Sequence, residues 1–183
     1  MEMKYLKIPK ERIGALIGKE GEVKHEIEER SGVKLNIDSK EGEVTIADEE
    51  AKDPVIGLKL ADIIKAIGRG FSPEKAFKLF SDDYYFALFD IRDYVGKSPA
   101  HVRRIKARVI GKDGKTRRII EELAGVDLSI YGDTVCIIGP AENLEVAKVA
   151  VDMLLNGAEH SSVYRFLEKK RREMKLAGLG FDL

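Results

Sequence analysis

An internal repeat constrains the fold of this chain more than any other feature, because both copies must be able to adopt one structure. Residues 16–38 align with residues 109–131 at an offset of 93 positions. Between Ile17 and Ile37, 11 of the 21 aligned positions are identical. The 183 residues suffice for two small domains, so we expect two copies of one module.

Both copies show the same order of predicted elements, β-α-α-β-β-α. Alternating apolar and polar residues predict short strands, and apolar residues three or four positions apart predict helices. The second helix of each copy should end at Gly32 or Gly125, because a left-handed glycine commonly follows a helix. The predicted strands are residues 4–8, 33–37 and 43–47 in the first copy and 84–91, 126–130 and 134–138 in the second. The order predicts an α+β module with helices on one face of a three-stranded antiparallel sheet.

Further helices are predicted from their apolar faces and their start signals. The helices that close the two copies carry apolar residues on one face, namely Leu60, Ile63, Ile64 and Ile67 in the first and Leu144, Ala147, Val151 and Leu154 in the second. Ser72, Ser98 and Ser161 are natural N-caps for a connector helix, the first helix of the second copy and a C-terminal helix. We therefore divide the chain into a first domain at 1–70, a helical connector at 71–83, a second domain at 84–158 and a C-terminal helix and tail at 159–183.

Each copy carries a Gly-x-x-Gly sequence between its first two helices, at residues 18–21 and 111–114. Glycines allow positive φ angles and close approach of the backbone to another chain. The following helix offers free N–H groups and the positive end of its dipole, which suit a phosphate. An isolated Gly-x-x-Gly is most often a tight turn between helices. Here it is embedded twice in the pattern I-G-K-[ED]-G-x(5)-I-E-E-x-x-G-V-x-L-x-I, which favours a functional loop.

The charge around the two loops differs, although the whole chain has a formal net charge of zero. Residues 100–118 contain eight basic residues and one acidic residue, a net charge of +7. The equivalent residues 7–25 contain five basic and three acidic residues, a net charge of +2. Because affinity for nucleic acid depends on the number of phosphates neutralised, the second copy should bind RNA more strongly.

Both copies resemble type I K-homology (KH) domains, in which this loop clamps the backbone of about four single-stranded nucleotides. The whole chain resembles the two-KH ribosome assembly factors of archaea and eukaryotes, the family called partner of the Nob endonuclease, or Dim-two. Besides the loops, the resemblance rests on stretches such as GFSPEKAFKLFSDDYY, YGDTVCIIGP and HSSVYRFLEKKRRE. Eukaryotic members generally lack the loop in their first copy, whereas it is intact here. The first loop is therefore open to either an RNA-binding or a protein-facing role.

The resemblance implies binding to single-stranded RNA, namely the 3′ end region of small-subunit ribosomal RNA during maturation, with a Nob-type endonuclease as partner. Translation initiation factors or other assembly factors are further candidate partners. The candidate RNA-binding residues of the second copy are Gly111, Lys112, Asp113, Gly114, Lys115, Arg117, Arg118, Arg104 and Arg108. The secondary, RNA-binding or protein-facing site comprises Gly18, Lys19, Glu20 and Gly21. We expect Val109, Ile110, Ile119, Leu128 and Ile130 to be divided between the core and an apolar groove for bases.

An adaptor that uses its KH modules mainly to dock proteins is the alternative function, and the acidic first copy favours it. We expect no enzyme activity, because no nucleophile, base or ligand set comes together in the sequence. The single cysteine, Cys136, lies in an apolar strand pattern and should be buried and inert. No metal site, cofactor, signal peptide or membrane span is expected, which predicts a cytoplasmic protein.

Overall fold

The computed structural model describes residues 4–47 and 53–178 and divides the chain into two compact units, residues 1–84 and 85–183. The sequence repeat is reproduced as a structural repeat, because each unit contains a three-stranded sheet with helices. The strand order is β1-β3-β2 in the first unit and β4-β6-β5 in the second. This common order confirms the predicted α+β class and two copies of one module.

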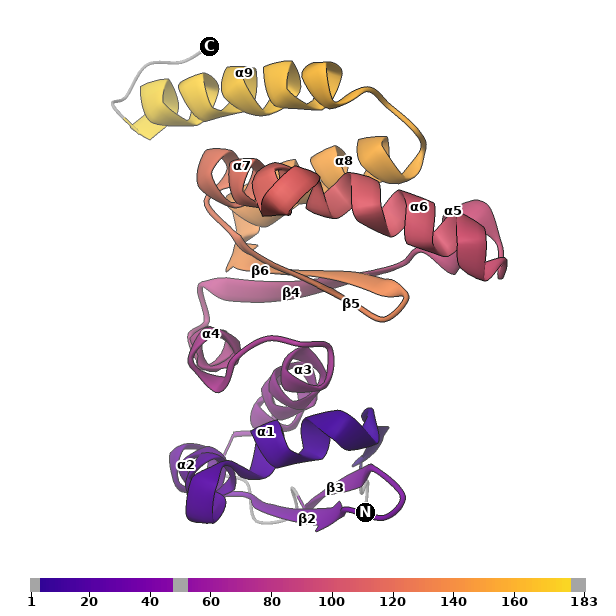
Figure 1. The fold of residues 1–183 in the computed structure, drawn as a ribbon. Helices are drawn as coiled ribbons and strands as arrows, with labels where there is room; N and C mark the ends of the chain where they lie inside the picture. The colour runs from indigo at the N-terminus through magenta and orange to yellow at the C-terminus, as the bar shows by residue number, and fades with distance from the viewer. Residues whose placement is uncertain (1–3, 48–52, 179–183) are drawn as a thin grey trace. The chain divides into compact units, whose positions relative to one another are not determined.

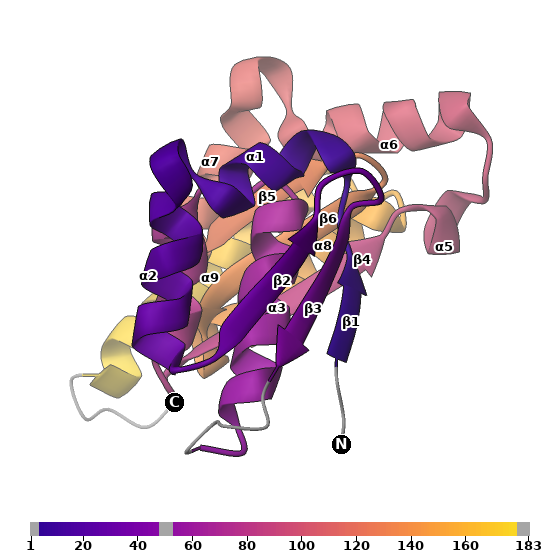
Figure 2. The same cartoon turned by 90° about the horizontal axis from the view of Figure 1, so that it is seen from below.

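The first unit builds an antiparallel sheet with β3 in the middle, as Figure 2 shows. Its strands are β1 (Lys4–Lys7), β2 (Lys34–Asp38) and β3 (Glu43–Ala47). Its helical segments are η1 (Lys10–Arg12), α1 (Ile13–Ile17), η2 (Lys19–Gly21), α2 (Glu22–Ser31), α3 (Ile56–Gly68), α4 (Pro73–Ala76) and η4 (Phe77–Phe80). The apolar face predicted for the closing helix is buried, since Leu60, Ile63, Ile64 and Ile67 are all 0% exposed.

The connector packs against the first unit as a short helical cap. Ser72 is the N-cap of α4, and its side chain accepts a hydrogen bond from the Lys75 backbone N–H, as predicted. The Arg30 guanidinium stacks over the Phe80 ring, 4.3 Å from its centroid. Lys59 of α3 forms an ion pair with Asp82 at the end of the connector. These contacts make the connector an ordered part of the first unit.

The second unit repeats this arrangement, with a longer helix before the loop and a longer closing helix. Its strands are β4 (Tyr84–Asp90), β5 (Asp127–Tyr131) and β6 (Thr134–Pro140). Its helical segments are α5 (Arg92–Val95), α6 (Pro99–Ile110), η5 (Lys112–Gly114), α7 (Lys115–Ala124), α8 (Ala141–Leu155) and α9 (His160–Gly178). Helices α6, α7 and α8 cover one face of the sheet, and α9 lies across their outer side (Figure 1). The KH module thus gains an extra layer in this unit.

Helix α9 is part of the core of the second unit. Val163 and Leu167 are 0% exposed and belong to the same apolar cluster as Val109, Ile120 and Leu144. The helix therefore cannot be removed without exposing the residues on which it packs.

Two of the predicted N-caps differ from the structure. Ser98 occupies the N-cap position of α6, but its side chain makes no capping hydrogen bond. The prediction of Ser161 as a cap is wrong, because α9 already begins at His160. The backbone N–H groups of Ser162 and Val163 bond to the carbonyl of Glu159, which shows that the first turn starts before Ser161.

A partly buried tyrosine joins two helices of the second unit. The Tyr94 hydroxyl of α5 donates to the Asp152 carboxylate of α8 at 2.7 Å. Burial and then this hydrogen bond raise the pKa of Tyr94 to about 12, so the donor is retained throughout the neutral range. None of the described helices is long and apolar enough to cross a bilayer. The side chain of Cys136 in β6 is buried, as predicted.

Arg12 fastens the beginning of the first unit to the end of α3, and this contact can be tested. Its Nε and one terminal nitrogen donate to the carbonyls of Ile67 and Phe71 at 2.8 and 3.0 Å. Replacement by the apolar methionine, Arg12→Met, should destabilise the first unit by about 2 kcal/mol, because charge-assisted hydrogen bonds are lost. Hydrogen exchange of the slowest α3 amides should accelerate about 30-fold, whereas the exposed control Lys10→Met should change it less than threefold.

Candidate nucleic-acid interface

The two Gly-x-x-Gly loops have the same backbone conformation. The first glycine of each loop has φ near 75° and ψ near 170°, a region that only glycine readily occupies. The second glycine of each is left-handed, with φ of 78° in Gly21 and 75° in Gly114. This agreement shows that the repeated motif codes for one specific turn between two helices.

Close packing makes the first glycine necessary. A Cβ atom on Gly111 would lie 2.6 Å from the backbone nitrogen of Thr116, and one on Gly18 would lie 2.8 Å from that of Val23. Real Cβ atoms essentially never approach so closely, and the obstacle is backbone, which cannot swing away. The end of one helix therefore rests directly on the first turn of the next. The two residues between the glycines project from this junction.

The second glycine has space around it. A Cβ atom on Gly114 would meet only the flexible tips of Arg118 and Arg117, at 3.7 and 3.9 Å, and one on Gly21 would meet nothing within 4 Å. The glycine N-caps of α2 and α7 provide no side-chain acceptor for the first turn. Both helix N-termini are thus open to an anion from outside.

The residue before each second glycine is left-handed without being glycine. Asp113 and Glu20 both have φ of 54° and both side chains are exposed, as expected for Asp113. Aspartate tolerates this conformation better than glutamate, because its short side chain can bond to the local backbone. The second loop is therefore the less strained of the two.

The predicted basic residues surround the second loop but are not equivalent. Arg104, Lys112, Lys115 and Arg118 are exposed. Arg117 is half-buried and forms an ion pair with Glu121 at 3.8 Å. The exposed cations are those available to neutralise phosphates.

Arg108 has a structural contact that the sequence did not reveal. Its guanidinium donates to the carbonyl of Ala158, just before α9, and its own carbonyl lies 2.9 Å from Nε2 of His160. In the first turn of α7, the buried Thr116 hydroxyl bonds to the Tyr164 hydroxyl at 2.9 Å. The start of α9 thus supports the loop from both sides of Gly111. One sequence feature could have indicated this contact: the second copy has the polar Thr116 at the position where the first copy has the apolar Val23.

The apolar residues predicted near the second loop fall into two groups, one buried in the core and one partly exposed. Val109 and Leu128 are at most 2% exposed and belong to the core cluster. Ile110, Ile119 and Ile130 are only half-buried. These three come from α6, α7 and β5, which contact one another, and they are the candidate residues for an apolar surface that bases could contact.

A glutamate common to both copies positions the strand beside this surface. Glu121 of α7 accepts a hydrogen bond from the Leu128 N–H at 3.3 Å, and Glu28 of α2 accepts one from Leu35 at 2.9 Å. No role was predicted for these two carboxylates. The sequence feature that could have indicated this role is that the residue is identical in the two copies. Both glutamates are the first glutamate of the I-E-E pattern.

The first loop has the same shape with a different chemical surface. Lys19 and Glu20 are exposed, like their counterparts Lys112 and Asp113. In α2, however, the exposed Glu22 and Glu26 stand at the positions of Lys115 and Ile119 in α7. Glu22 thus stands in place of a candidate phosphate-binding cation, and Glu26 stands in place of a candidate groove residue. Both changes disfavour a polyanion.

The second loop thus carries exposed cations next to partly exposed apolar side chains. In the parts of the chain that the structure covers, no three His, Cys, Asp or Glu residues are grouped as metal ligands.

Comparisons with known proteins agree with this geometry. Residues 85–172 match a family model described as a eukaryotic type KH-domain (KH-domain type I), and residues 3–55 match a KH domain model. A KH domain-containing protein of Methanocaldococcus jannaschii is 53% identical over 173 residues, which cover 94% of this chain and 75% of that protein. The pre-rRNA-processing protein PNO1 of Coccidioides immitis is 31% identical over 144 residues, covering 78% of this chain and 56% of PNO1.

A solved structure is similar over nearly the whole chain. It is the crystal structure of an a/eIF2alpha–aDim2p–rRNA complex from Pyrococcus horikoshii. The matching chain is 45% identical, with a TM-score of 0.85, and the similarity covers 93% of this chain and 94% of that one. The chain thus spans almost all of its structural relative but only about half of PNO1.

The unequal surroundings of the two glycines predict unequal effects of alanine. Gly111→Ala should lower the free energy of unfolding by about 3 kcal/mol or more, because it combines a forbidden conformation with a clash against Thr116. Gly114→Ala should cost only about 1 kcal/mol, the price of a left-handed alanine. Urea denaturation of both variants checks this, and equal losses would show that the close approach at Gly111 is not needed.

Proposed function

The chain belongs to the family of two-KH-domain proteins that includes archaeal Dim2p and PNO1, and on this basis we propose that it binds single-stranded ribosomal RNA during assembly of the small ribosomal subunit. The site would be the loop at residues 111–114 with α6, α7 and β5 around it. The proposed target is the 3′ end region of the small-subunit RNA. The rRNA complex that contains the similar Pyrococcus chain supports this proposal.

The observation that carries the proposal is the exposed cationic surface around an open helix N-terminus. Lys112 and Lys115 flank the glycine N-cap of α7, whose first turn has no side-chain cap. A phosphate at this point would receive backbone N–H groups, the positive end of the helix dipole and two ammonium groups. Arg104 and Arg118 extend the positive surface along the helices on either side.

The apolar surface next to the loop completes the site. With the backbone held at the loop, the bases can lie on Ile110, Ile119 and Ile130. Aliphatic side chains contact the faces of all four bases, so sequence preference would come from hydrogen bonds at the base edges. Arg108 is partly engaged by the Ala158 carbonyl, so we assign it to supporting the loop as well as to RNA contact.

The first copy is proposed as a weaker RNA site or a protein-facing surface. It keeps the loop with Gly18, Lys19, Glu20 and Gly21, but Glu22 and Glu26 lower its positive charge and interrupt its groove. This same observation favours the second candidate function, an adaptor that docks proteins through its KH modules. The two functions are compatible, because they would use different copies.

We propose a Nob-type endonuclease as a protein partner, and translation initiation factors or other assembly factors as further partners. Support comes from the family resemblance and from the presence of a/eIF2alpha in the complex of the similar Pyrococcus chain. We assign the chain no catalytic step: it would act by holding RNA for other factors. Its proposed location is the cytoplasm.

Matched charge reversals in the two loops test the proposed ranking. Lys112→Asp should weaken binding of the full chain to a single-stranded rRNA 3′-end oligonucleotide by about 1–3 kcal/mol, or roughly 5- to 150-fold. Lys19→Asp should cost markedly less. Fluorescence anisotropy measures both affinities, and the salt slope of log K should fall by about 0.7 for Lys112→Asp.

Both lysines are exposed, so the substitutions should leave folding intact, which circular dichroism can verify. Equal loss of affinity in the two variants would overturn the dominance of the second copy. Affinity that is no tighter than for an unrelated polyanion, together with unaffected binding in both variants, would favour the adaptor.

A further inference from the structure

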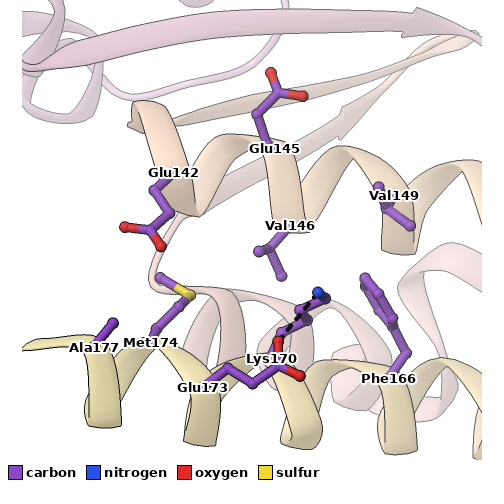
Figure 3. A pocket seen from close by; sticks show the side chains of 9 residues that line it. All are labelled: Glu142, Glu145, Val146, Val149, Phe166, Lys170, Glu173, Met174 and Ala177. Atoms are coloured by element: carbon purple, nitrogen blue, oxygen red, sulfur yellow. Dashed lines mark ion pairs between the residues drawn. The ribbon is translucent and has the colours of Figure 1, made fainter. Parts of the chain in front are cut away.

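An open apolar groove lies between α8 and α9, outside the site described above. It has a volume of about 670 Å³, and Figure 3 shows its side chains. Val146 points into it from α8, and Phe166 and Met174 lie across from it on α9. None of the loop residues lines this groove. It therefore needs an explanation separate from the RNA site.

The apolar side chains of the groove lie at the outer margin of the core, because Val146 and Phe166 pack partly against it and remain partly exposed. In α8, Ala147, Ala150 and Val151 are 0% exposed and face the core, whereas Val149 is 45% exposed. Val146 and Val149 are three positions apart and so share one face. An amphipathic helix does not need an exposed apolar residue such as Val149 to fold, so this extension of the apolar face of α8 indicates a surface for contact with another molecule.

The shape of the groove suits a helix. In Figure 3, Val149 lies opposite Phe166 and Glu142 lies near Met174, so α8 and α9 run antiparallel. Two antiparallel helices present rows of side chains with a furrow between them, into which a third helix packs. A small molecule would usually meet polar groups that converge inside its pocket, but the Glu145 carboxylate points away from this one.

The charged side chains at the rim of the groove indicate the charge of the partner that it would bind. Three carboxylates and one ammonium group line the groove, and the ammonium of Lys170 is paired with Glu173 at 3.1 Å. Glu145 is paired with Lys148 at 3.2 Å, whereas Glu142 is exposed and has no ion pair among the residues that the structure describes. At Glu142 the α8 wall is therefore acidic, which repels phosphate and attracts lysine or arginine.

We propose that the groove between α8 and α9 docks an amphipathic helix of another protein, with an apolar face and a basic edge. The apolar face contacts Val146, Val149 and Phe166, and the basic edge faces Glu142. Because α9 touches α7 on one side and forms the groove with α8 on the other, the helix and the RNA occupy different flanks of α9. The second unit can then hold both ligands at once.

Synthetic peptides test the chemistry of the occupant without knowledge of its identity. One probe is a fluorescent 18-residue peptide with leucines at helical spacing and lysines elsewhere, and the control has the same composition in scrambled order. The patterned peptide should bind the full chain at least tenfold more tightly than the scrambled one. A patterned peptide with glutamate in place of lysine should bind at least tenfold more weakly than the lysine peptide.

Two pairs of variants locate the peptide. Val149→Asn should weaken binding of the lysine peptide about tenfold, whereas Leu58→Asn, which changes an exposed apolar residue of α3, should change it less than twofold. Glu142→Lys should weaken binding about fivefold, and Glu74→Lys on α4 should not. All four side chains are exposed enough for the variants to fold. RNA affinity measured on the same samples should be unchanged by Val149→Asn.

Several results would overturn the proposal. Equal binding of the patterned and scrambled peptides would show that the groove attracts basic peptides by charge alone and does not recognise an amphipathic helix. Equal effects of Val149→Asn and Leu58→Asn would place the peptide elsewhere. If Val149→Asn weakened RNA binding, the occupant would be nucleic acid. If sedimentation showed a dimer that this variant dissociates, the occupant would be a second copy of the chain.

Discussion

The close approach of Gly111 to the backbone of Thr116 is the contact on which the proposed RNA site depends. It lets the end of α6 rest on the first turn of α7, so that Lys112 and Asp113 project beyond both helices. The same contact leaves the N-terminus of α7 uncovered and directs it outward. In the second unit, α9 holds this junction through Tyr164 and the Arg108 contacts, so the extra helix contributes to the site without forming its surface.

Two copies of one backbone have diverged in chemistry. The loops agree in every glycine conformation, yet Lys115 and Ile119 of the second copy correspond to Glu22 and Glu26 of the first. A shared fold therefore does not imply a shared ligand. The zero net charge of the chain conceals this difference, because it averages a strongly basic loop region with acidic surfaces elsewhere, including the α8 wall.

The fold was predictable because local signals and the repeat agree. Glycines mark the ends of α2 and α7, and periodic apolar residues mark the buried faces of α3 and α8. The division of apolar residues between core and groove was not predictable, since Val109 and Ile110 are adjacent and chemically alike. Contacts distant in sequence were also missed, such as Thr116 with Tyr164, because a hydroxyl pair leaves no spacing pattern. The start of α9 was placed two residues too late, because Ser161 offers a cap that the backbone does not use.

The central claim is that the second loop is the main place at which this chain holds RNA. Photocrosslinking of the full chain to a single-stranded oligonucleotide containing 4-thiouridine, followed by mass spectrometry of the peptides, tests it most directly. We predict that crosslinks concentrate in residues 104–119, on both sides of the loop, and are sparse in residues 11–26. Crosslinks that are equally abundant in the two copies, or that avoid both loops, would contradict the account.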